Sequence, residues 1–85
     1  MPQISRFYGI IILMNFNDHL PPHFHAWYNE YKITVNIEDG EINGNMPARA
    51  LRLILEWWEL HKEALMEAFK LVKISLIGNF REYNN

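Results

Sequence analysis

The segment from Ile33 to Ile37 alternates strictly between apolar and polar residues, and this alternation constrains the fold more than any other feature. Successive side chains of a strand point to opposite faces, so the segment predicts a strand with one buried face. A second short segment, His23 to Tyr28, precedes it and is separated from it by Asn29-Glu30. Because asparagine tolerates positive φ, we expect a two-residue hairpin. The register that follows pairs Tyr28 with Tyr31, Ala26 with Ile33, and Phe24 with Val35.

The opposite face of this hairpin is polar. A shift of the pairing by one residue would expose the isoleucines and bury the polar side chains, so the alternation makes such a shift unfavourable. The two strand histidines are therefore expected to lie together on the polar face. The full set of side chains on that face is His23, His25, Trp27, Lys32, Thr34 and Asn36.

The remaining segments predict an α+β domain: a three- to four-stranded antiparallel sheet followed by one long or kinked helix packed on one face. Residues Arg6 to Phe16 are apolar on both alternating faces, which is typical of a strand that is covered on both sides. Asp39-Gly40 is a second hairpin signal, after which Glu41 to Asn43 adds a stub of strand. Pro47 suits the first turn of a helix, and apolar residues recur at helical spacing from Ala50 to Val72.

A helix from Pro47 to Lys73 would be about 40 Å long, which exceeds the length of the predicted strands. We therefore expect a bend or break near Leu60 to Lys62, or a helix that extends beyond the sheet onto a partner. His61 falls on the apolar stripe and is expected in the core. Residues 74–85 either dock as a strand or remain loose, and residues 1–85 form a single domain.

The composition narrows the possible functions. The 85 residues contain no cysteine, so disulfides and thiolate metal sites are excluded. The formal net charge is -2, whereas domains that bind nucleic acid are usually basic. The apolar run from Ile10 to Met14 is too short to span a bilayer, and no signal peptide is visible. These features predict a soluble cytoplasmic domain with no membrane partner.

The segment from Asp18 to His25 carries three of the four histidines, next to a carboxylate and a Pro-Pro step. Histidine can donate or accept hydrogen bonds, bind metal and transfer protons near neutral pH. Two residues apart on a strand, His23 and His25 can converge on a zinc ion if Asp18 or His19 supplies a third ligand. We expect no metal or other cofactor; a zinc site on Asp18, His23 and His25 is the alternative hypothesis.

The same two histidines are also candidate catalytic residues of a ribonuclease. A histidine can accept a proton from a ribose hydroxyl while a lysine stabilises the developing charge. The residues expected to bind phosphate or another ligand are Asp18, His19, Trp27, Lys32, Asn36, Arg49 and Arg52. In the structural alternative, Asp18 caps the turn and the histidines bond to the loop backbone. Arg49 and Arg52 lie in the first helical turns, where they either meet an anion or pair with Glu56 or Glu41.

Three segments carry a resemblance to known proteins. They are Ile4 to Gly9 (ISRFYG), Phe16 to His25 (FNDHLPPHFH), and Met46 to Leu53 (MPARALRL) with the following Glu56-Trp57. These motifs resemble a small bacterial family catalogued as domain of unknown function 4160, and the resemblance extends from about Ile4 to about Phe69. Members of that family are often encoded beside another small protein, in pairs similar to toxin–antitoxin modules.

A weaker similarity concerns the HicA-type toxins, which cleave messenger RNA. They too have three strands with one strand histidine before a helix that begins at proline, so His23 or His25 is the nearest match to their catalytic residue. We expect a small interaction protein, one component of a bacterial toxin–antitoxin-like pair, that binds a small protein partner or a second copy of itself. The alternatives are a ribonuclease toxin that meets RNA and uses His23 and His25, and the zinc site.

Overall fold

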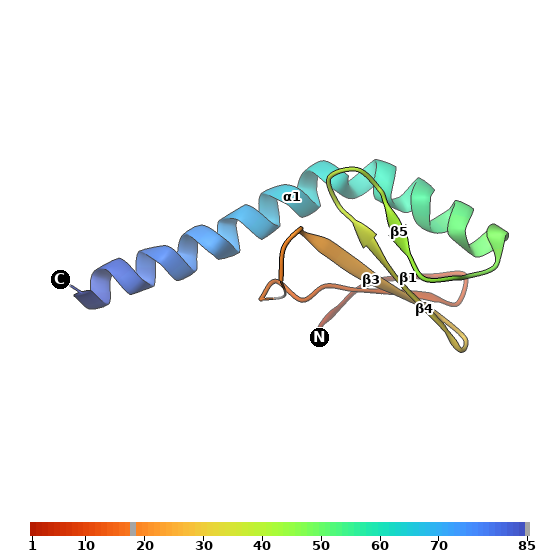
Figure 1. Ribbon diagram of the computed structural model, residues 1–85, viewed down its shortest axis with the longest axis horizontal. Helices are drawn as coiled ribbons and strands as arrows, with labels where there is room; N and C mark the ends of the chain where they lie inside the picture. Colours follow the sequence, from red (N-terminus) through yellow and green to blue (C-terminus); the bar gives the residue numbers. More distant parts are fainter. Residues whose placement is uncertain (18, 85) are drawn as a thin grey trace.

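The computed structural model describes residues 1–17 and 19–84, with side chains as far as residue 72. Five antiparallel strands form one sheet in chain order, and a long helix lies across one face of it (Figure 1). The elements are β1 (Gln3–Phe7), β2 (Ile10–Leu13), β3 (His23–Tyr28), β4 (Tyr31–Asn36), β5 (Ile42–Asn43) and α1 (Ala48–Asn84). The predicted α+β class, with an antiparallel sheet and a helix on one face, is confirmed.

The central hairpin has the register that the alternation predicts. β3 and β4 pair Phe24 with Val35, Ala26 with Ile33, and Tyr28 with Tyr31. Asn29 takes a φ of 52° at the turn, a conformation that asparagine adopts more readily than most residues. The apolar face of this hairpin forms the core together with β2 and α1. The buried members of the core are Ile10, Ile12, Met14, Phe24, Ala26, Ile33, Val35, Ile37, Met46, Ala50, Ile54, Leu65 and Phe69.

The predicted single strand from Arg6 to Phe16 is wrong, because the chain reverses at Tyr8-Gly9. Both residues have positive φ, 48° and 79°, the combination that a tight two-residue hairpin turn requires. β1 therefore pairs with β2 in an additional hairpin, and the sheet has five strands instead of three or four. Tyrosine is rare in such a turn, which is why the sequence did not indicate it.

The second predicted hairpin and its strand stub are present. β5 pairs with β4 after a turn in which Gly40 has a φ of 74° and its N–H donates to the carbonyl of Asn36 at 2.8 Å. The indole of Trp58 closes this end of the sheet, where its Nε1–H donates to the carbonyl of Ile37 at 2.7 Å. The interaction joins α1 to the chain segment that leaves β4.

α1 begins directly after Pro47, whose carbonyl accepts the N–H of Leu51 at 3.0 Å. α1 is continuous, so the expected break near residues 60–62 is absent, but Figure 1 shows the helix changing direction in its teal part, near residue 60 on the colour bar, where a bend was the other form of that expectation. The helix also extends beyond the sheet. Residues 74–84, expected as a strand or a loose tail, belong to α1. No helix in the described part of the chain is both long and apolar enough to cross a membrane.

His61 is not the expected core histidine. It is exposed, and its ring lies against that of Trp57 with the two centroids 4.6 Å apart. Trp57 itself occupies the space between helix and sheet, because its ring also meets Phe24 at 5.3 Å and Phe7 at 6.3 Å. The apolar stripe of α1 therefore reaches the core through Trp57, and the following turn places His61 on its outer side.

Candidate functional site

One face of the sheet carries the histidines, and α1 covers the other face (Figure 1). Strand pairing arranges the side chains of the first face in rows across the sheet. One row joins Leu13, His25 and Thr34, and the next joins Ile11, Trp27 and Lys32. We call this surface the histidine face; its residues are Gln3, Arg6, Ile11, Leu13, His23, His25, Trp27, Lys32, Thr34 and Asn36. The prediction that the two strand histidines share a face is confirmed.

His23 lies at the centre of a cluster of imidazole rings. Its ring centroid is 5.1 Å from that of His19 and 5.2 Å from that of His25. The side chain is only 7% exposed, and its Nδ1 lies 2.9 Å from the carbonyl oxygen of Pro21. Because a carbonyl only accepts, Nδ1 carries the hydrogen in this bond, which leaves Nε2 as the basic nitrogen of neutral His23. The expected bond from a histidine to the loop backbone is thus present at His23.

The described residues contain no group of three or more histidine, cysteine or carboxylate side chains placed to hold a metal ion. Asp18, which was expected to cap the turn or to join His23 and His25 around zinc, lies outside the described residues. The ring contacts of His19 place it beside His23, as the sequence hypothesis required; the His19 and His23 rings are tilted by 33°, and the His23 and His25 rings meet edge-on at 61°.

The remaining polar candidates on β3 and β4 lie where the register predicts. Lys32 stands over the ring of Trp27, with Nζ 4.6 Å from the ring centroid, so the cation is stabilised by the aromatic face. Asn36 pairs with His23 at the other end of the strands. Lys32 is two residues along β4 from Thr34, the partner of His25, so the two positions are about 7 Å apart.

Arg49 and Arg52 do not join the histidines, because they lie on α1 and α1 packs against the opposite face. Both side chains are exposed, and neither forms the expected ion pair with Glu56 or Glu41, although the structure describes all four residues. A ribonuclease site that combines both histidines with both arginines is therefore not assembled in this fold.

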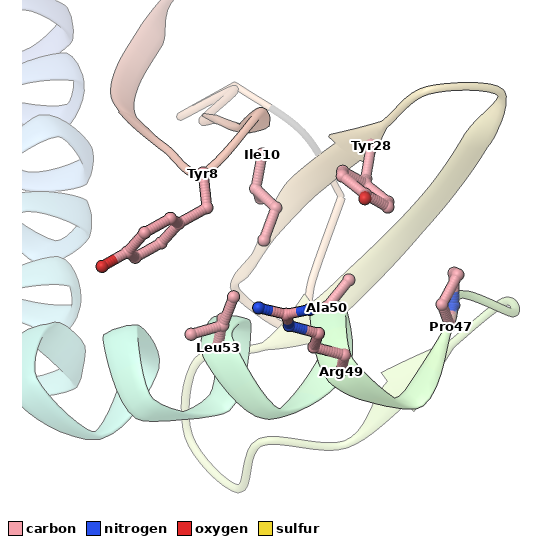
Figure 2. A pocket seen from close by; sticks show the side chains of 7 residues that line it. All are labelled: Tyr8, Ile10, Tyr28, Pro47, Arg49, Ala50 and Leu53. Atoms are coloured by element: carbon pink, nitrogen blue, oxygen red, sulfur yellow. The ribbon is translucent and has the colours of Figure 1, made fainter.

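Arg49 instead lines a cavity of about 620 Å³ that the sequence did not predict. The cavity lies between the Tyr8-Gly9 turn, the end of β3 and the first turns of α1 (Figure 2). Its lining residues are Tyr8, Ile10, Tyr28, Pro47, Arg49, Ala50 and Leu53. The sequence would have indicated this cavity if Tyr8-Gly9 had been recognised as a turn, because the turn takes Tyr8 out of the predicted strand and places it near the start of α1.

Comparison with known proteins identifies one family. The model of the family described as domain of unknown function (DUF4160) matches residues 9–70. No curated protein and no solved structure matches the chain. The weaker similarity to HicA-type toxins gains no support from these comparisons.

Proposed function

The chain belongs to the family described as domain of unknown function (DUF4160), and from this premise we propose that it is a small interaction protein that binds a protein partner through its histidine face. In this proposal it is one component of a bacterial, cytoplasmic toxin–antitoxin-like pair, and the partner is the small protein encoded beside it. The observation that supports it best is the apolar cluster of Ile11, Leu13 and Trp27 on the sheet face opposite α1.

The side chains of the histidine face suit a protein partner. Ile11, Leu13 and Trp27 are neighbours on adjacent strands, with Leu13 already buried and the other two half-buried. Central apolar and aromatic side chains surrounded by polar ones are typical of protein interfaces, where tryptophan often contributes much of the binding energy. Lys32, His25 and Thr34 provide the polar surroundings here.

The net charge favours a protein over RNA. Binding to nucleic acid depends mainly on cations that neutralise phosphates, and this chain has a formal charge of -2. Two of its cations, Arg49 and Arg52, lie in the helix layer away from the histidines, and Lys32 is already stacked on Trp27. Arg6 lies on the same face, where it pairs with Ile11 and donates to Gln3 Oε1 at 3.4 Å. The described part of the histidine face thus offers only Arg6 and Lys32 as cations for a phosphate backbone.

Co-expression of the chain with the protein encoded next to it tests the proposal. We expect the two proteins to co-purify, and Trp27→Ala to weaken the complex at least tenfold, which corresponds to about 1.4 kcal/mol. Leu60→Ala is the matched control, because Leu60 is a large apolar residue, 81% exposed, on α1. A complex that Trp27→Ala leaves intact, or that Leu60→Ala weakens equally, would contradict binding through the histidine face.

A second candidate function is a ribonuclease toxin that uses His23 and His25. The 5.2 Å separation of these rings supports it, together with the Nδ1 bond that makes Nε2 the basic nitrogen of His23. In this mechanism one imidazole accepts the proton of a ribose 2′-hydroxyl while the other protonates the leaving oxygen. Lys32 stabilises the developing charge only if it leaves the ring of Trp27.

Induced expression in a bacterial host tests the second candidate. A toxin should arrest growth and cleave RNA, and His23→Ala/His25→Ala should abolish both effects while circular dichroism shows a folded protein. The control is His61→Ala, which removes an exposed histidine from α1. Absence of growth arrest with the unmodified chain, or arrest that survives the double substitution, would exclude a histidine-dependent ribonuclease.

A further inference from the structure

We propose that the cavity lined by Arg49 binds a small aromatic carboxylate, with the guanidinium of Arg49 paired to the carboxylate and the ring held beside Tyr8 and Tyr28. We call it the Arg49 cavity. It lies where the start of α1 meets one end of the sheet, whereas the histidine face is on the other side of the sheet. The inference is therefore independent of the proposed partner binding.

The size of the Arg49 cavity fits a small molecule. Its volume is about 620 Å³, within the ~300–1,000 Å³ of typical small-molecule sites. Most of its walls are apolar, supplied by Ile10, Ala50, Leu53 and Pro47, with two tyrosines on opposite sides (Figure 2). A few polar groups in a mainly apolar cavity are the usual composition of a ligand site.

The shape of the walls favours an aromatic body. Tyr8 is held at the turn with 82% of its surface exposed, although it is a large aromatic residue that borders the cavity. A planar ligand between Tyr8 and Tyr28 would cover this ring and gain offset or edge-to-face contacts. An inorganic anion could pair with Arg49 but would leave the apolar walls and the ring of Tyr8 exposed to water.

The charge of the site favours a carboxylate. Arg49 lies in the first turn of α1, and its guanidinium points along the helix toward Leu53 on the helix side of the cavity (Figure 2); that turn contains no acidic residue. Arg49 is exposed and has no ion pair with Glu41 or Glu56. A guanidinium binds a carboxylate through two parallel hydrogen bonds, and the positive end of the helix dipole adds to the attraction. The ligand thus complements both the cation and the apolar walls.

Calorimetric titration of the full chain with three probes tests the proposal. Indole-3-acetate carries the ring and the carboxylate, indole-3-acetamide carries the ring without the charge, and inorganic phosphate carries charge without a ring. We expect indole-3-acetate to bind at least tenfold more tightly than either of the other two. Equal binding of the acetate and the acetamide, tighter binding of phosphate, or no binding of any probe would overturn the proposal.

Two arginine variants locate the binding. Arg49→Gln should weaken indole-3-acetate at least tenfold and leave indole-3-acetamide unchanged, because only the carboxylate contacts the guanidinium. Arg52→Gln removes the same charge one turn along α1 from a residue that does not line the cavity, and it should leave both affinities unchanged. Equal losses in the two variants would indicate a general electrostatic effect and would also overturn the assignment.

Discussion

Gly9 and Gly40 share a left-handed backbone, with φ of 79° and 74°, but their surroundings differ. A Cβ at Gly9 would lie 3.6 Å from the ring of Tyr28, an ordinary contact distance. At Gly40 it would lie 2.9 Å from the ring of Trp58, which its hydrogen bond to the carbonyl of Ile37 holds in place. At position 9 only the backbone conformation favours glycine, whereas at position 40 the packing of Trp58 favours it as well.

The two turn glycines therefore predict unequal effects of the same substitution. Gly9→Ala should lower the free energy of unfolding by about 1–2 kcal/mol, the cost of a left-handed backbone with a Cβ. Gly40→Ala should lower it by a further ~1–3 kcal/mol, because the methyl group must displace a hydrogen-bonded indole. Urea denaturation followed by tryptophan fluorescence measures both variants. Equal losses would contradict the steric role assigned to Trp58.

The position of His23 shows which part of the candidate site a sequence can predict. Alternation along β3 and β4 places His23 and His25 on one face, and the strand pairing agrees. The burial of His23 and its bond to the carbonyl of Pro21 depend on how the preceding loop folds back. Loop paths depend on tertiary contacts that no periodicity encodes, so the environment of His23 could not be predicted.

Among the elements, the hairpins show how far local turn chemistry can be read from a sequence. Asn29 and Gly40 adopt positive φ where the sequence predicts turns. Tyr8 adopts it where the sequence predicts a continuous strand, because apolar residues continue on both sides of Tyr8-Gly9. The missed turn accounts for the additional strand and for the unpredicted Arg49 cavity, so one residue pair explains both errors.

The helix shows the opposite case, in which both the apolar pattern and the geometric argument were right. Apolar residues at helical spacing predicted α1, and Ala50, Ile54, Leu65 and Phe69 are buried along one side of it. A bend or an extension past the sheet was expected because the helix is longer than the strands, and Figure 1 shows both. A helix is stabilised by its own backbone hydrogen bonds along its whole length, so it can continue past the sheet that it covers. Figure 1 shows this continuation.

The whole molecule has two layers and therefore two separated surfaces for binding. The histidine face lies on the outer side of the sheet, and the Arg49 cavity lies where the sheet meets the start of α1. Because the core side chains of the sheet stand between them, a protein partner on the first surface leaves the second accessible. Partner binding and carboxylate binding can thus be measured in the same sample, and each has its own variant, Trp27→Ala or Arg49→Gln.

The molecule's longest dimension, 52 Å, includes the part of α1 that continues past the sheet (Figure 1). Phe69 is the last buried core residue of α1 among the side chains that the structure describes, which reach residue 72, so a chain that stops after Val72 retains every buried residue described. We expect this truncation to lower the Tm by less than about 4 °C, the shift that ~1 kcal/mol produces in a domain of this size. Thermal circular dichroism measures it, with Ile54→Ala as the control that removes a buried side chain and costs ~2–5 kcal/mol. If truncation lowers the Tm as much as Ile54→Ala does, residues 73–85 stabilise the folded domain. A separate outcome concerns association: if the Tm of the full chain rises with protein concentration and the Tm of the truncated chain does not, a second copy binds this extension.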